Sequence, residues 1–398
     1  MQEDTRRRRR RRRRSRDRRR RVMRAYFFRL VFLLVFIALV VGAVKLTAHI
    51  ASALSKDKTE EKTTAETEGG SETQEPPVIK LSDAEAENTD EPNADGSSEG
   101  VETAPEVSEN KAEKYEAPKK DYIYAEDGSP AYMGSGEYTS TYGIVVNATD
   151  MKVKAVKNAH DRIYPASMTK ILTLLVACEH IEDLDEMFEV TIEDTDYAFS
   201  NDLSTAGFQV GERVSMRDLL YGTILPSGGD AAHALARAVA GSEEAFAEMM
   251  NEKLASLKLP DPAHFTDCSG VFNENHYCSA YDMAVIINAA MDHPLAREVL
   301  MAHRYTTMAT QEHPDGISLS NLFLRRIEDK DTGGEVLGAK TGYVVKSGNC
   351  AASYYTCGTD GKDYICVSAD AHSAWRAIYD HVAAYNIYAA GNTSYHKQ

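Results

Sequence analysis

A serine and a lysine that could do chemistry together stand three positions apart, at Ser167 and Lys170, ahead of the apolar run 171–176. Because Pro165 suits the first turn of a helix, this stretch predicts a buried helix that starts near the serine. Side chains at i and i+3 of a helix emerge on one face, so the two should meet. A buried lysine with a lowered pKa can take the proton of a serine hydroxyl, and the helix dipole places positive charge beside that serine. The pattern predicts a nucleophile and its general base within one helical turn.

Two further motifs supply polar groups that such a pair would need. Ser227 begins Ser-Gly-Gly on a loop between two predicted helices, and Lys340 begins Lys-Thr-Gly on a predicted strand. Serine and lysine are common residues, so an isolated Ser-x-x-Lys would be weak support for catalysis. A Ser-x-x-Lys, then a serine loop, then a Lys-Thr-Gly, in this order, is the signature of penicillin-recognising serine acyltransferases.

The elements that must position these motifs are strands at both ends of the folded part, with helices between them. Strands are expected at residues 142–146, 152–156, 350–356 and 364–369. Helices are expected at residues 214–220, 230–236, 280–291 and 375–388, with Ser215 as the cap of the first. This order predicts an α+β domain whose sheet combines distant parts of the chain.

From about Tyr142 to its C-terminus the chain resembles the D-alanyl-D-alanine carboxypeptidases, the low-molecular-weight penicillin-binding proteins of serine peptidase family S11. The residues that carry the resemblance are 158–170, 208–212, 225–227, 275–282 and 338–343. The resemblance implies a penicillin-binding-protein and β-lactamase-like transpeptidase fold. In that fold an antiparallel sheet is flanked by helices and joined to a helical subdomain, with the site between them.

The resemblance assigns the catalytic roles. Ser167 would be the acyl-ester nucleophile, Lys170 its proton acceptor, and Ser227 the relay between that lysine and the leaving group. The family usually has asparagine where this chain has Gly229, and the asparagine amide helps to hold the peptide group of the substrate. The departure at Gly229 therefore concerns substrate orientation and leaves the nucleophile intact.

Substrate binding is assigned by the resemblance to Lys340, Thr341, Gly342 and Tyr343. Lys340 would pair with the free carboxylate of the terminal D-alanine, as the charge of a lysine allows. The backbone N–H groups of Ser167 and Tyr343 would form the oxyanion hole. Gly342 has no side chain, so a substrate is expected to lie along that strand edge.

The implied activity is removal of the terminal D-alanine from peptidoglycan stem peptides through an acyl-enzyme on Ser167, with β-lactams as covalent inhibitors. A D,D-endopeptidase acting on cross-links would use the same residues, and a departure at Gly229 would also suit an inactive peptidoglycan-binding or penicillin-binding module. A class A β-lactamase would need a Glu-x-x-x-Asn element between Ser227 and Lys340, and none occurs there. No cofactor is expected. No metal is expected either, because no cysteine–histidine spacing suggests zinc.

The N-terminal part predicts attachment to a membrane. The formal net charge is -16, yet residues 6–14 are an unbroken arginine run within an arginine-rich segment at 1–25. The apolar stretch at 26–50 is long enough to cross a bilayer, which needs about 20 residues. The charge asymmetry then places the N-terminus in the cytoplasm, which argues against nucleic acid as the partner of the arginines. A signal peptide cleaved near Ala51-Ser52-Ala53 is the alternative.

Beyond the span, residues 51–120 are acidic and poor in large apolar side chains, which predicts a disordered spacer. The carboxypeptidase domain is expected at 121–398, outside the cytoplasm, on a protein that crosses the cell membrane once. Among the 6 cysteines, Cys178 is expected as a buried free thiol, and Cys268 and Cys278 are placed where they could form a bridge. His233 lies among alanines on a predicted helix, which favours packing over catalysis.

Overall fold

The computed structural model describes residues 120–126, 128–134, 136–392 and 395. The arginine-rich segment, the expected span at 26–50 and all of the expected spacer except Lys120 lie outside these residues. Within the described part of the chain, no helix is both long enough and apolar enough to cross a membrane.

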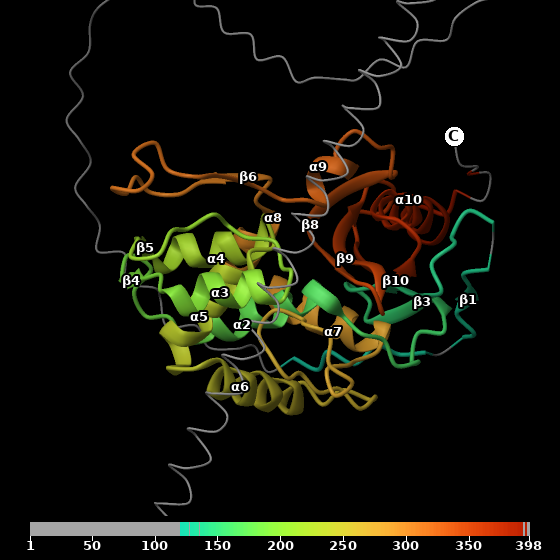
Figure 1. The fold of residues 1–398 in the computed structure, drawn as a ribbon. Helices are drawn as coiled ribbons and strands as arrows, with labels where there is room; N and C mark the ends of the chain where they lie inside the picture. The colour runs from blue at the N-terminus through green and yellow to red at the C-terminus, as the bar shows by residue number, and fades with distance from the viewer. Residues whose placement is uncertain (1–119, 127, 135, 393–394, 396–398) are drawn as a thin grey trace, which may run out of the picture. The chain divides into compact units, whose positions relative to one another are not determined.

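A six-stranded sheet has its strands in the order β1-β3-β2-β10-β9-β8 (Figure 1). The strands are β1 (Ala131–Tyr132), β2 (Tyr142–Asn147), β3 (Lys152–Lys157), β8 (Gly334–Val344), β9 (Gly348–Cys357) and β10 (Asp363–Ala371). In the middle of the sheet, β2 and β10 form an antiparallel ladder in which Val146 pairs with Ile365. The prediction of an α+β fold with a sheet built from distant parts of the chain is confirmed.

The expectation of a wholly antiparallel sheet is wrong at one edge, where β1 pairs in parallel with β3. The connection from β1 to β2 crosses one face of the sheet, where Met133 and Tyr138 are buried in one cluster with Val145 and Ala155. The chain then returns through the antiparallel hairpin of β2 and β3. A strand of only two residues has too few positions to show the alternation that reveals longer strands.

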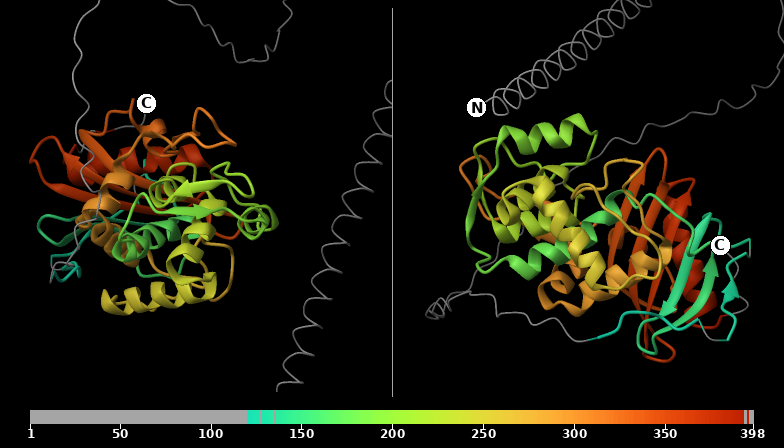
Figure 2. Two further views of the ribbon diagram at one scale, coloured as in Figure 1. Left: turned by 90° about the vertical axis from the view of Figure 1, so that its left-hand side faces the viewer. Right: turned by 90° about the horizontal axis from the view of Figure 1, so that it is seen from below.

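Helices cover both faces of the sheet. Ile144 and Val146 of β2 are buried in the cluster that contains α7 (Ala280–Asp292), whereas Val145 lies in a cluster with Tyr385 at the end of α10 (Ala374–Ala384). This alternation is what a strand with two covered faces requires. Figure 2 shows the sheet on one side of the described domain and the other helices grouped beside it.

The helical part lies between β3 and β8 in the chain. Its helices are α3 (Ile192–Ser200), α4 (Met216–Ile224), α5 (Gly229–Ala240), α6 (Glu243–Ser256) and α8 (Pro294–Met301), and α9 (Leu324–Ile327) is a single turn. Two small strand pairs join β4 (Met187–Glu189) to β5 (Arg213–Ser215) and β6 (Arg304–Thr306) to β7 (Ser318–Ser320). Ser215 caps α4 as predicted, because its side chain accepts the Asp218 N–H at 3.1 Å. The chain ends its regular structure in a short π-helical turn, η2 (Tyr385–Ala389).

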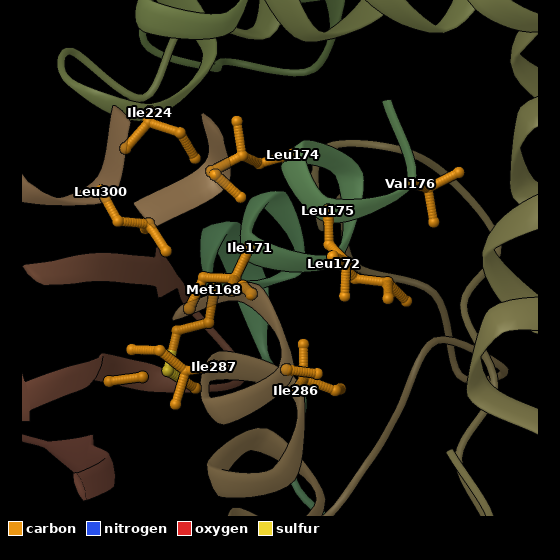
Figure 3. Packing of buried hydrophobic residues seen from close by; sticks show 14 of the residues in the cluster. Met168, Ile171, Leu172, Leu174, Leu175, Val176, Ile224, Ile286, Ile287 and Leu300 are labelled. Atoms are coloured by element: carbon orange, nitrogen blue, oxygen red, sulfur yellow. The ribbon is translucent and has the colours of Figure 1, made fainter. Parts of the chain in front are cut away.

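Helix α2 (Lys170–His180) lies where the sheet and the helical part meet. All of its residues from 170 to 178 are buried. Ile171 belongs to the same apolar cluster as Ile287 of α7 and Leu300 of α8 (Figure 3). A helix that is covered on every side is a core helix. The predicted buried helix is confirmed, although it begins at Lys170 and not at the serine.

All 6 cysteines lie in the described residues and are buried free thiols. The prediction for Cys178 is confirmed, and Cys268 and Cys278, which could have formed a bridge, are both free thiols. The Cys268 Sγ lies 3.5 Å from Glu243 Oε1. The backbone of Cys278 pairs instead with Ile163.

His233 packs in a polar cluster between α5 and α3, as its position in the sequence predicts. Its ring stacks on Tyr197, with centroids 4.5 Å apart, and its Nδ1 lies 2.7 Å from Asp194 Oδ1. The other carboxylate oxygen of Asp194 accepts from Arg237 at 2.6 Å. Burial alone would raise the pKa of Asp194, but the hydrogen bonds from His233, the Thr191 N–H and Arg237 hold it below its ordinary value.

Replacing this carboxylate tests the cluster. Asp194→Ala should lower the free energy of unfolding by about 2–3 kcal/mol, because it leaves His233 and the partly exposed Arg237 without their shared acceptor. Urea unfolding measures the loss, and Asp196→Ala, which removes an exposed acid from the same helix, is the matched control. Since the folded-state pKa of Asp194 is depressed, its stabilisation is present above the unfolded pKa and disappears as the pH falls through the folded one. Equal losses in both variants would contradict this account.

Candidate active site

Ser167 lies in η1 (Ala166–Thr169), a 3-10 turn directly before α2. Ala166 has a φ of 49°, in the left-handed region that residues with a Cβ rarely adopt. Gly270 supports the turn from one side, where an added Cβ would lie only 1.8 Å from the Ala166 carbonyl oxygen. Strained backbone of this kind persists only where the surrounding structure holds it in place. Here it fixes the backbone that presents the Ser167 hydroxyl.

Lys170 is the first residue of α2 and has no exposed surface. Its Nζ lies 3.1 Å from Ser167 Oγ and donates to the Ser269 carbonyl at 3.0 Å. Burial lowers the pKa of Lys170 to about 8. As a neutral amine it keeps a hydrogen for the Ser269 carbonyl and has a lone pair for the serine hydroxyl. The predicted pairing of Ser167 with Lys170 is therefore present in the structure.

A buried turn that the sequence argument missed positions the acceptor for Lys170. Asp267 Oδ1 accepts the N–H groups of residues 269–271 at 2.8, 2.6 and 3.1 Å. Its other oxygen lies 3.1 Å from His276 Nδ1. Burial would raise the pKa of Asp267, but His276 and these N–H groups keep it below its ordinary value. The signal was an aspartate that precedes Ser269 and Gly270, a sequence suited to a side-chain-bonded turn.

Ser227 and Lys340 form a second serine–lysine pair. Ser227 lies between α4 and α5 with a φ of 65°, another left-handed residue with a Cβ. Its Oγ accepts a hydrogen bond from Lys340 Nζ at 2.8 Å, and the same nitrogen donates to the Thr341 carbonyl at 2.8 Å. Burial, and then the positive charge of Lys170, hold the pKa of Lys340 well below its ordinary value. We expected the Ser227 hydroxyl to act beside Lys170. The hydrogen bond that the structure shows for this hydroxyl is instead with Lys340.

Strand β8 lies at the edge of the sheet. It carries Lys340 and its neighbours to η1, the turn that contains Ser167. A Cβ added at Gly342 would lie 3.0 Å from the backbone nitrogen of Ser167 and 2.8 Å from the Pro165 carbonyl oxygen. The space beside Gly342 is therefore occupied by the turn, and the assignment of Gly342 to substrate binding stays a prediction. Close approach of two backbones is the reason for glycine here. The side chain of Tyr343, the next residue, is 60% exposed.

Gly229 begins α5, and its φ lies outside the left-handed region. An added Cβ would lie 2.6 Å from Leu203 Cδ1. The space beside Gly229 is thus occupied by a leucine from another segment. Among the described residues, no group of three or more His, Cys, Asp and Glu side chains is placed to hold a metal ion.

The mixed sheet, the helical part and the two serine–lysine pairs at their junction are the features of a penicillin-binding protein of low molecular weight. The chain belongs to the D-alanyl-D-alanine carboxypeptidase family, peptidase family S11, whose sequence profile matches residues 130–373. The family expected from the sequence motifs is confirmed.

Relatives named D-alanyl-D-alanine carboxypeptidase include DacF of Bacillus subtilis, 34% identical over 143 residues, and DacA of Escherichia coli, 33% identical over 219 residues. These matches cover 36% and 53% of this chain and 36% and 51% of those relatives, so the chain spans about a third to a half of their length. A variant of the DD-transpeptidase of Streptomyces K15 matches with a TM-score of 0.58 and 26% identity, over 64% of this chain and 99% of that one. A D-alanyl-D-alanine carboxypeptidase of Mycobacterium tuberculosis, 23% identical with a TM-score of 0.55, shares the fold over 63% of this chain and 93% of its own.

The lowered pKa of Lys170 predicts how acylation depends on pH. Acylation of Ser167 by a fluorescent penicillin should accelerate as the pH rises toward about 8, because only the neutral amine can accept the serine proton. Rates measured from about pH 6 to about pH 10, with a thermal melt at each pH, separate this effect from unfolding. A rate that stays flat across that range in folded protein would contradict the role of Lys170.

Proposed function

We propose that this protein is a membrane-anchored serine D-alanyl-D-alanine carboxypeptidase. Its substrate would be the peptidoglycan stem peptide, from which it removes the terminal D-alanine. The observation that carries the proposal is the 3.1 Å contact between Lys170 Nζ and Ser167 Oγ, in a site that also buries Lys340. Membership of the family and the names of the relatives support the choice of substrate.

In the acylation step, neutral Lys170 takes the hydroxyl proton while Ser167 Oγ attacks the carbonyl carbon of the penultimate D-alanine. The backbone N–H groups of Ser167 and Tyr343 are the proposed donors to the oxyanion. The closeness of Gly342 to the Ser167 nitrogen supports this choice, because it places the two segments side by side. The peptide C–N bond then breaks, and the ester forms on Ser167.

The second serine–lysine pair is proposed to hold and release the leaving D-alanine. Lys340 would bind the terminal carboxylate as an ammonium ion, because the opposite charge offsets the cost of burying the lysine. Ser227, hydrogen-bonded to Lys340, would relay to the departing amine the proton that Lys170 took from Ser167, which leaves Lys170 neutral again. A water molecule then attacks the ester while Lys170 takes a proton from it. Lys170 returns this proton to Ser167 Oγ as the ester C–O bond breaks, so the free acid leaves and Ser167 is regenerated. β-Lactams would acylate Ser167 and act as covalent inhibitors.

Labelling with penicillin tests the mechanism. Penicillin should add its mass to the peptide that carries Ser167, and Ser167→Ala should take up none. Lys170→Ala should slow acylation by about 10²–10⁴-fold, the usual worth of general-base catalysis. Label on any other serine would refute the assignment, and a folded protein that takes up none would indicate an inactive binding module.

Turnover assays then define the reaction. A soluble peptide ending in Lys-D-Ala-D-Ala should lose its terminal D-alanine. A cross-linked peptide dimer tests the D,D-endopeptidase alternative, because the same residues would serve both reactions. Cleavage of the dimer without cleavage of the linear peptide would replace carboxypeptidase by endopeptidase.

We also propose that residues 26–50 anchor the protein in the cell membrane with the N-terminus in the cytoplasm, and that residues 51–120 are a spacer. The apolar stretch and the arginines before it support this topology. In intact cells whose outer surface is accessible, protease should cut after residue 53 while the arginine-rich segment stays protected. Recovery of a mature protein that begins at Leu54 would show a cleaved signal peptide instead.

A further inference from the structure

The connection from α3 to β5 crosses the start of α5, close to the loop that carries Ser227. We call residues 201–206 of this connection the crossing segment. The Gly229 N–H donates to the Ser204 carbonyl at 2.7 Å. The Ala206 N–H donates to Asp230 Oδ1 at 2.7 Å, and Asp230 is almost wholly buried. The crossing segment is thus tied to the first two residues of α5 by hydrogen bonds on both sides of Thr205.

Two glycines permit this approach. A Cβ at Gly228 would lie 2.8 Å from the Ala206 nitrogen. A Cβ at Gly229 would lie 2.6 Å from Leu203 Cδ1 and 2.8 Å from Leu203 Cβ, closer than real Cβ contacts come. The Leu203 side chain therefore fills the space where a side chain on Gly229 would begin.

Leu203 differs from its neighbours on the crossing segment. Asp202, Ser204 and Thr205 are exposed, whereas Leu203 is half-buried over Gly229. Asp202, directly before Leu203, has a φ of 52°, a left-handed conformation that residues with a Cβ rarely adopt. A half-buried leucine keeps apolar surface that a bound molecule can cover.

We propose that Leu203 is a specificity-determining residue of this active site, which contacts the substrate in place of the side chain that Gly229 lacks. The inference rests on the proposed function. Gly229 lies two residues after Ser227, whose hydroxyl is 2.8 Å from Lys340 Nζ, and Leu203 packs over that glycine. An alkyl side chain offers no hydrogen bond to a peptide group, but it packs well against a methyl group. Leu203 therefore selects for the methyl side chain of the penultimate D-alanine.

The same contact explains why an amide cannot simply be added at position 229. Gly229→Asn would push its Cβ into Leu203, and the crossing segment would have to move away from α5. The single variant should therefore bind peptide more weakly and melt at a lower temperature. Leu203→Ala in the same chain removes the closest contact, with Cδ1, but keeps the Leu203 Cβ, so the double variant should recover both properties in part. Substitutions at residues in contact are not additive, and the size of this recovery measures their coupling.

The test uses full-length protein and two peptides, one ending in Lys-D-Ala-D-Ala and one with glycine in the penultimate position. Leu203→Ala should reduce the preference for the D-alanine peptide by about four-fold, the worth of one buried methyl group, mainly through KM. Leu203→Met should keep the preference, because methionine fills a similar volume. Val210→Ala is the matched control, since Val210 is an apolar residue of the same connection that is 52% exposed.

Penicillin labelling of each variant separates the two proposals. A natural protein that takes up no penicillin refutes the proposed function. If it is labelled but Leu203→Ala keeps the full preference for D-alanine in a folded protein, only the role of Leu203 is refuted. Gly229→Asn that melts like the natural protein and turns over peptide at least as fast would also refute it, because the leucine would then leave room for the amide.

Discussion

Burying the amine of Lys170 is the constraint on which the rest of the site depends. An ammonium ion loses most of its hydration in a protein interior, and the interior favours the neutral form instead. Helix α2 is covered on every side, so its first residue cannot reach water. The Ser269 carbonyl, presented by the Asp267 turn, satisfies one hydrogen of the amine. The basicity of the site thus follows from the packing of the core.

Backbone contacts without intervening side chains bring the parts of the site together. Gly270, in a loop, and Gly342, in β8, both approach the backbone of the turn that contains Ser167. Gly228 leaves room for the crossing segment next to Ser227. A packed interior adjusts little to an added methyl group. The positions of Ser167 and Ser227 are therefore set by backbone, which also holds both of the left-handed residues Ala166 and Ser227 in place.

The sequence predicted the contact of Ser167 with Lys170, and the helix and strand that carry Lys170 and Lys340, because these residues stand in short motifs on strongly patterned segments. It did not predict α3, where only Asp194 and Ala198 are buried and no apolar stripe appears, although the capping box of Thr191 and Asp194 was readable. It also missed the Asp267 turn and the contact of Leu203 with Gly229. The Asp267 turn had a local signal, but its place beside Lys170, like the contact of Leu203 with Gly229, depends on how segments far apart in the chain approach each other, and local patterns hold no information on that.

The pairing of β2 with β10 also determines at which stage of folding the site can form. Val146 meets Ile365 only after the helical part of the chain has been made. Closing a loop of this length costs entropy before any native contact stabilises the closed form. Topologies rich in contacts between distant residues therefore fold slowly. Until the sheet closes, the turn with Ser167 lacks the strand that carries Lys340. We expect reactivity to arise in one late step of folding, so that a newly made or partly degraded chain is inert.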